Sequence, residues 1–360
     1  TWTWDGSSST SWDTGANWDK NTVPLAGASP VIPDCTSINA PHLATDITLK
    51  GLTIQSAGKF YLDGHNLGFG SAAAVDNSGT IYLYGNETLT NVSNLDQDSG
   101  TVEYTGTSGP YTLKSFTGAD YYNLKINGAG TTFNLPADLD IDGALNIAAG
   151  VLDATENNYG ITLAGNWTNS GTFTARSGTV TLNGTTQTIA GSTTFNNLTF
   201  TAPQTVTFTA GTTQTFNGTF TCTGSTGNII TLASSTTSVF TLSKSSGTVD
   251  CDYISVSYST ATGGATWNPG AHSTDGGNNS GWVFNTAPTL TSVADTPDPI
   301  KGGATITIAP TGQGDAESNT LYYYCAETTA PTAITTLCSQ ANASYTTPYS
   351  TMTCTYAVTT

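Results

Sequence analysis

The sequence predicts an all-β protein built mainly as a parallel β-solenoid, and three observations support this fold class. Only 9% of the 360 residues are charged, against about a quarter in typical globular proteins. Aromatic residues nevertheless make up 10%, and Thr, Val and Ile recur throughout, a composition typical of strands rather than of disorder. No long stretch has the 3.6-residue apolar spacing of an amphipathic helix.

A short repeated phrase marks the expected strands. It reads Gly-Thr, an apolar residue, any residue, and a fifth position that is often apolar. Each copy has the form of a turn glycine followed by a short alternating strand. The six copies lie at 79–83, 100–104, 171–175, 178–182, 218–222 and 247–251.

The spacing of these copies favours a solenoid over a string of β-sandwiches. Sandwich strands also alternate, but the repeating unit here is roughly 20–30 residues, below the ~100 of an immunoglobulin domain. Thr-rich and Asn-rich faces suit ladders of like side chains on neighbouring coils. About ten coils, with strands about 4.8 Å apart, would form a rod on the order of 50 Å long.

The composition changes near residue 285, where we place a domain boundary. Proline becomes frequent, and three of the six cysteines fall in the last 36 residues. We expect a solenoid over 1–284 with an aromatic N-terminal cap, and an immunoglobulin-like β-sandwich over 285–360 with strands at 304–308 and 321–325. This second module is short for its fold, which leaves open an incomplete domain or one that continues into others.

The tryptophans near each end of the solenoid have two interpretations. A solenoid end must cover its apolar core, so we expect them to cap the first and last coils. The alternative is a sugar-stacking platform at the N-terminal end. The residues concerned are Trp2, Trp4, Trp12 and Trp18 at the start, and Trp267 and Trp282 at the end.

The net charge of −17 excludes several kinds of partner. The eight basic residues are scattered, whereas nucleic-acid binding needs grouped Lys and Arg. An acidic surface also disfavours anionic lipid, and no apolar run reaches membrane-spanning length. The chain opens at Thr1 without Met, for which signal removal is the expected reason, so we predict an extracellular or cell-surface location.

The cysteines favour disulfides over zinc, because no Cys-x-x-Cys pair occurs and His42, His65 and His272 are far apart. Cys222 and Cys251 hold the fifth place in two copies of the phrase, so they would stack if those copies lie on adjacent coils. The three cysteines near the C-terminus cannot all pair with one another in disulfides, so one of them is free or pairs elsewhere, including with another chain. These are Cys325, Cys338 and Cys354; Cys35 has no obvious partner.

Several segments resemble secreted bacterial surface proteins. The Trp-rich opening at 1–6, with Trp12, 17–18 and 23–24, resembles the start of their β-helical domains, and 263–284 resembles the end. Residues 285–299 resemble the first strand of immunoglobulin-like repeats. The resemblance implies a pectate-lyase-like right-handed parallel β-helix. Both adhesins and polysaccharide lyases have this fold, so the fold alone does not distinguish between these functions.

A lyase would need a carboxylate cluster that binds metal and a Lys or Arg that acts as base. Asp138, Asp140 and Asp142 alternate along one predicted strand and share a face, which makes them calcium candidates. A neighbouring coil would have to supply Lys114 or Lys125. The alternative is a solvated strand face.

Three other motifs have weaker chemical interpretations. Asp275, with Asn278 and Asn279, is a second calcium candidate, or a polar turn that closes the last coil. His65 follows a turn glycine, and a lone histidine in such a place is more often a surface residue than a catalytic one. Sequons begin at Asn86, Asn91, Asn166, Asn183, Asn197, Asn217, Asn278 and Asn342, and they matter only if the source glycosylates its surface; the Thr-rich faces are equally candidate O-glycan sites.

These features predict a non-enzymatic extracellular protein, an adhesin or stalk that acts by binding and structural presence. One alternative is a self-assembling subunit of an extracellular filament or sheath, since solenoid ends carry strand edges. Another is a glycan-binding module or polysaccharide lyase. The expected partners are a second copy of the chain, a host or neighbouring-cell surface, or glycans, with no cofactor other than calcium as a candidate.

Overall fold

A computed structural model describes residues 1–95, 98–116 and 120–284, together with the backbone of five strands beyond residue 291. The chain divides into two compact units, Thr1–Trp282 and Val283–Thr360. Within the described residues, no helix is long and apolar enough to cross a membrane.

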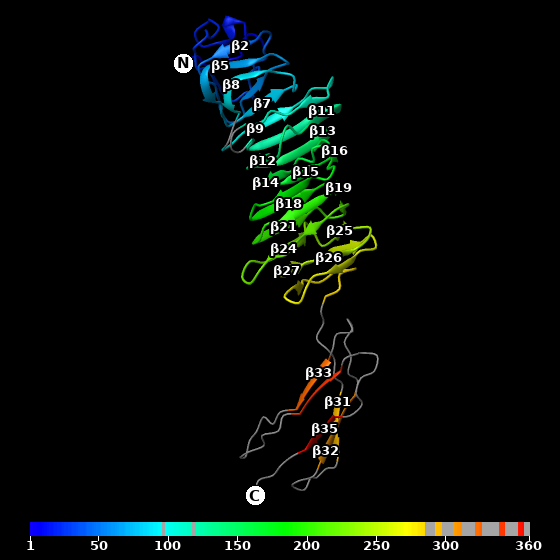
Figure 1. Cartoon of the computed structure of the whole chain (residues 1–360). Coiled ribbons are helices and arrows are strands. Elements are labelled where there is room, and N and C mark those ends of the chain that lie inside the picture. The colour runs from blue at the N-terminus through cyan, green and yellow to red at the C-terminus, as the bar shows by residue number, and fades with distance from the viewer. Residues whose placement is uncertain are drawn as a thin grey trace. The chain divides into compact units, whose positions relative to one another are not determined.

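The first unit is a parallel β-solenoid, as the sequence predicts (Figure 1). Its longest sheet has a path of eleven strands, one from each successive coil, and every pairing along it is parallel. The path comprises β4 (Lys59–Tyr61), β7 (Thr80–Leu83), β9 (Thr101–Tyr104), β11 (Asn123–Asn134), β13 (Leu145–Asp153), β15 (Trp167–Asn169), β18 (Thr186–Ala190), β21 (Gln204–Phe208), β24 (Ile230–Ser234), β27 (Ile254–Val256) and β30 (Thr274–Asp275). Two short strands, β10 (Tyr111–Thr112) and β16 (Thr172–Thr174), pair with β11 and β13.

Smaller parallel sheets form the other faces of the coils. Near the N-terminus these are β1 (Val31–Ile32), β3 (Thr53–Ile54) and β6 (Asp76–Asn77), and β2 (Ile47–Leu49), β5 (Leu67–Ala74) and β8 (Leu89–Asn94). Farther along, one sheet contains β12 (Leu139–Ile141), β14 (Ile161–Leu163), β17 (Thr179–Leu182), β20 (Asn197–Phe200) and β23 (Phe220–Thr221). The others contain β19 (Thr193–Phe195), β22 (Thr213–Phe216), β25 (Phe240–Ser243) and β28 (Ser259–Thr262), and β26 (Thr248–Asp250) with β29 (Thr266–Asn268).

The coils vary in length while their inward residues stay in register. Trp167 pairs with Ile189, 22 residues on, and Ile189 pairs with Phe208, 19 residues on. All three side chains are fully buried. Because side chains alternate along a strand, these inward columns form one continuous apolar core, and the length differences fall in the corners between strands.

Buried amides satisfy the backbone where the coils turn. The Gln187 amide nitrogen donates to the carbonyl of Leu163 at 2.9 Å, and that of Gln214 donates to Gly191 at 2.9 Å. The Gln214 oxygen accepts the N–H of Thr193 at 3.1 Å. Such bonds replace the water that a buried corner excludes.

An aromatic cap closes the N-terminal end, and Asn17 holds it together. Trp4, Trp12 and Trp18 are buried and pack edge to face. The Asn17 side chain, in the 3₁₀ turn η1 (Gly15–Asn17), accepts the N–H groups of Ser8 and Ser9, both at 2.8 Å. The cap prediction therefore holds for these three tryptophans.

Trp2 departs from the predicted cap. It is only half-buried, and the Lys20 ammonium lies 4.9 Å from its ring centroid. The chain turns back between Trp4 and Trp18, which pair antiparallel. The Trp2 carbonyl accepts the N–H of Val31 at 2.8 Å, but its side chain stays partly exposed at the surface. At the other end, buried Trp267 packs against Trp282 at 5.3 Å, as expected for the last coil.

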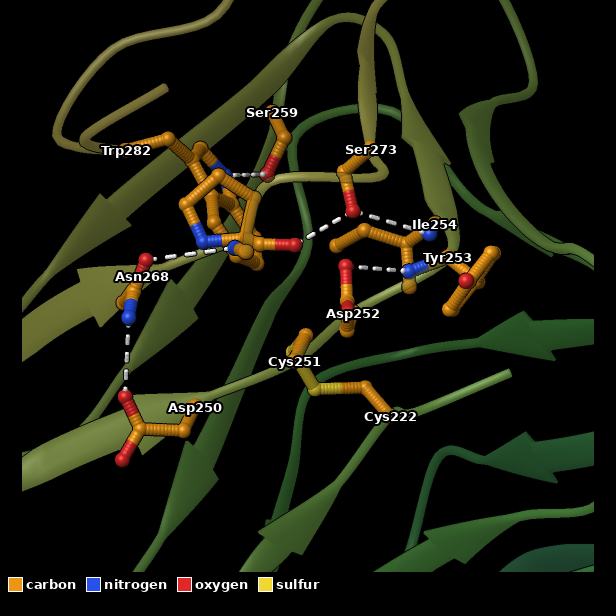
Figure 2. The surroundings of a disulfide bond; sticks show 12 residues. Cys222, Asp250, Cys251, Asp252, Tyr253, Ile254, Ser259, Asn268, Ser273 and Trp282 are labelled. Atoms are coloured by element: carbon orange, nitrogen blue, oxygen red, sulfur yellow. Dashed lines mark hydrogen bonds between the residues drawn. A yellow bond between two sulfur atoms is a disulfide. The ribbon is translucent and has the colours of Figure 1, made fainter. Parts of the chain in front are cut away.

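The disulfide between Cys222 and Cys251 is present, which confirms the pairing predicted from the repeat (Figure 2). Cys222 directly follows β23 and Cys251 directly follows β26, and Thr223 pairs in parallel with Asp252 one residue later. The two copies of the phrase therefore occupy adjacent coils. Cys35 is buried and is not in a disulfide.

The second unit is described only as backbone strands. β31 (Ser292–Thr296), β32 (Thr305–Thr311) and β35 (Met352–Thr355) pair antiparallel, as do β33 (Leu321–Cys325) and β34 (Cys338–Asn342). The predicted immunoglobulin-like sandwich as a whole lies outside the described residues. So do the side chains of Cys325, Cys338, Cys354 and Asn342.

Candidate functional site

The acidic strand lies as predicted, on the outer face of β12. Asp138 and Asp142 are exposed and Asp140 is half-buried, whereas Leu139 and Ile141 point into the core. Burial, with the charges of Asp142 and Asp120, raises the pKa of the Asp140 carboxyl above its usual value.

The lysines that a lyase would need do not join this strand. The Lys114 ammonium donates to the carbonyl of Gly85 at 3.2 Å, and Lys125 pairs with Glu103 at 3.2 Å. In the described part of the chain, no group of three or more His, Cys, Asp or Glu side chains is placed to hold a metal ion. The predicted arrangement of calcium and base is thus not assembled around Asp138, Asp140 and Asp142.

Lys114 instead borders a second acidic group. Glu87 is buried, and its carboxylate accepts the backbone N–H groups of Gly64, Tyr84 and Gly85. Burial lowers the pKa of Lys114, and the Glu87 charge opposes that shift. Both side chains line an open hollow of about 350 Å³. Because Glu87 is bonded to three backbone donors, it serves mainly to fix this loop.

Asp275 belongs to a turn that bonds to itself. Its carboxylate accepts the N–H of Gly277 at 2.8 Å and the side-chain amide of Asn279 at 2.6 Å. Asn279 in turn accepts the N–H of Ser259 at 2.9 Å. These contacts match the polar turn that closes the last coil, the alternative to a calcium loop.

Aromatic rings stack along the outer surface, which sequence reasoning did not find. Tyr61 lies between His42 and Tyr82, with centroid distances of 4.1 Å and 4.0 Å and nearly parallel rings. His42 also contacts the Asp63 carboxylate at 2.6 Å. Because neighbouring rings cover both faces of Tyr61, this stack stabilises the coils and leaves no free face of Tyr61 for a sugar.

The other two histidines have carboxylate neighbours as well. The Nδ1 atom of His272 lies 2.8 Å from a carboxylate oxygen of Asp252, and the His272 ring stacks on Tyr253. Figure 2 shows Tyr253 near the disulfide. His65 lies 3.7 Å from Asp46. Each histidine is at least partly exposed, in agreement with the surface interpretation of His65.

The sequon side chains differ in how free they are. The amide nitrogens of Asn91 and Asn197 donate to backbone carbonyls, of Phe69 at 2.9 Å and Ser177 at 3.1 Å. Attachment of a glycan at either position would disturb those bonds. The Asn166 side-chain oxygen accepts the N–H of Thr188 at 2.7 Å. The other described sequon residues, Asn86, Asn183, Asn217 and Asn278, are exposed.

A polar hollow opens beside the acidic strand and is a candidate binding site. It measures about 320 Å³ and lies over β14 and β17. One column of outward side chains runs past it in register, beginning with Asp140. We call the threonines that follow in this column the hydroxyl ladder: Thr162, Thr181, Thr199 and Thr221. The polar residues that line the hollow are Asp138, Asn158, Thr162, Ser177, Thr179 and Thr181.

No family model, curated protein or solved structure matches the chain.

Proposed function

We propose that this chain is a non-enzymatic extracellular surface protein, a stalk or adhesin that holds or presents a binding surface. The observation that carries the proposal is the uninterrupted stack of parallel, in-register coils. Eleven strands spaced about 4.8 Å apart give a rod on the order of 50 Å long. A stack with one continuous core resists bending, which suits a spacer.

Three features support a location outside the cell. A disulfide between neighbouring coils is favoured in oxidising compartments. The net charge of −17 suits a protein that stays dissolved and dispersed. The Trp-rich opening also resembles secreted bacterial surface proteins with pectate-lyase-like β-helices.

The closed N-terminal end of the solenoid favours a stalk over a filament subunit. The chain turns back between Trp4 and Trp18, and the backbone N–H of Asp5 donates to the carbonyl of Asn17 at 2.8 Å. This turn occupies strand-edge groups that a second copy would otherwise pair with. The lyase alternative loses support because Lys114 and Lys125 are engaged away from the acidic strand.

The proposal is tested on the cells that produce the protein. An antibody raised against 1–284 should label intact, unpermeabilised cells, and added soluble chain should reduce their attachment to a surface. Heat-unfolded chain is the matched control and should not compete. Label that appears only after permeabilisation would overturn the proposal.

A further inference from the structure

A missing side chain opens the polar hollow. On successive coils, the outward position before the apolar strand residue is held by Asp138, Gly160, Thr179, Asn197 and Thr219. Gly160 alone among them has no side chain, and the space of about 320 Å³ lies over it. We call this space the Gly160 hollow.

The walls of the Gly160 hollow are fixed before any ligand arrives. One Asp138 carboxylate oxygen accepts the N–H of Gly160 at 2.7 Å, which holds the carboxylate at the edge of the space. Asn158 accepts the N–H of Ser177 at 2.9 Å and donates to the carbonyl of Glu156 at 3.1 Å. A site whose polar groups are already ordered loses less conformational entropy on binding.

An ion pair fixes the turn behind this wall. Asp153 receives two hydrogen bonds from the Arg176 guanidinium, at 2.9 and 2.7 Å. The same carboxylate accepts the N–H of Thr155 at 2.8 Å. The turn that carries Asn158 is therefore tied to the strands on both sides.

The lining selects the chemistry of the ligand. Four hydroxyls, of Thr162, Ser177, Thr179 and Thr181, both donate and accept hydrogen bonds, and the second oxygen of Asp138 is an acceptor. The lining holds no Lys or Arg, so it offers an anion no charge partner. One carboxylate is too little for calcium, which takes 6–8 oxygen ligands. Neighbouring hydroxyls of an uncharged sugar match this set.

We propose that the Gly160 hollow binds one residue of an uncharged polysaccharide, whose chain continues along the hydroxyl ladder. Thr181, Thr199 and Thr221 repeat there at one hydroxyl per coil, about every 4.8 Å. The inference rests on the proposed surface role, since it names the partner that such a protein would hold.

The test uses the full chain on an array of neutral, uronate and amino-sugar polysaccharides, followed by measurement of Kd for the best ligand. We expect neutral polymers to bind. Asp138→Asn keeps the shape and removes the charged acceptor, and should weaken binding about tenfold. Gly160→Thr fills the space and should abolish binding.

A control variant makes the same substitution on the solenoid away from the hollow. Gly68 also stands between threonines on neighbouring coils, Thr48 and Thr90. A Cβ at Gly68 would meet its nearest atom at 3.5 Å, an ordinary contact, whereas a Cβ at Gly160 would lie 3.1 Å from the Thr179 carbonyl oxygen. Gly160→Thr must therefore also keep the wild-type melting temperature for its loss of binding to count. Gly68→Thr should leave the Kd unchanged.

Two outcomes would overturn the inference: no neutral glycan binds, or Asp138→Asn and Gly160→Thr bind as the wild type does. Either outcome can occur while the antibody still labels intact cells and soluble chain still competes for attachment. Failure of this inference is therefore distinguishable from failure of the proposed function.

Discussion

Cys222 and Cys251 lie opposite each other on neighbouring coils, with their Cα atoms 5.1 Å apart and a disulfide between them. They are 29 residues apart in sequence, and the segment between them contains β24, β25 and β26. The bond therefore spans one coil. Both side chains are buried, so the disulfide ties coils that already share the apolar core.

Removal of this disulfide should destabilise the solenoid. Closing a loop of about 30 residues limits the unfolded chain by about 3–4 kcal/mol in the chain-entropy model. The double variant C222A/C251A should lose about that much unfolding free energy in urea titrations, and the wild type with reductant should lose a similar amount. The double variant should then be insensitive to reductant; a response would point to another disulfide.

The N-terminal cap should depend on Asn17. Its side chain accepts two backbone N–H groups and donates to Ser9 and to the carbonyl of Ser11. Asn17→Ala would remove the acceptor of the Ser8 and Ser9 N–H groups and leave a space at the buried position of the Asn17 side chain, at a cost of about 2 kcal/mol. Hydrogen exchange should rise first in the capping segment and the coil beneath it.

Exposed Asn183 provides the control for this change. Asn183→Ala should alter stability by less than about 0.5 kcal/mol. Equal effects of Asn17→Ala and Asn183→Ala would contradict the role assigned to Asn17.

Arg176 should make the solenoid's stability depend on acid pH. Its hydrogen bonds to Asp153 lower the pKa of that carboxyl below the usual value. A carboxyl with a depressed pKa stabilises the fold above its unfolded pKa of about 3.9 and loses this contribution as pH falls through the folded pKa. Arg176→Gln should therefore lower the melting temperature at pH 7.

The difference between Arg176→Gln and the wild type should shrink as pH falls below about 4 and vanish once Asp153 is protonated. Thermal melts at a series of pH values measure this. A difference that stays constant across the series would assign the effect to lost packing of the Arg176 side chain rather than to the ion pair.

The sequence was sufficient to predict the solenoid and its disulfide because both follow from local repetition. Turn glycines followed by alternating residues specify a strand, and equal places in two copies specify which residues stack. The alternation of Asp138, Asp140 and Asp142 around Leu139 and Ile141 was predictable for the same reason.

The Gly160 hollow could not be predicted from one strand, because it arises between three coils. Asp138, Gly160 and Thr179 are about 20 residues apart, and the coil length varies, so register alone brings them together. A signal was present: Gly160-Ile161-Thr162 stands where Thr179-Val180-Thr181 and Thr219-Phe220-Thr221 have threonine first. Recognising it requires the copies to be aligned across coils.

The closed N-terminal cap predicts that the protein does not polymerise end to end. Trp4, Trp12 and Trp18 are buried within the chain itself, and the strand edge is occupied by the turn back to Asn17. Negative-stain images of the full chain should therefore show separate particles at all concentrations, with or without reductant. Fibres with a regular axial repeat that lengthen with concentration would instead favour the filament subunit, and loss of those fibres in reductant would trace assembly to a cysteine.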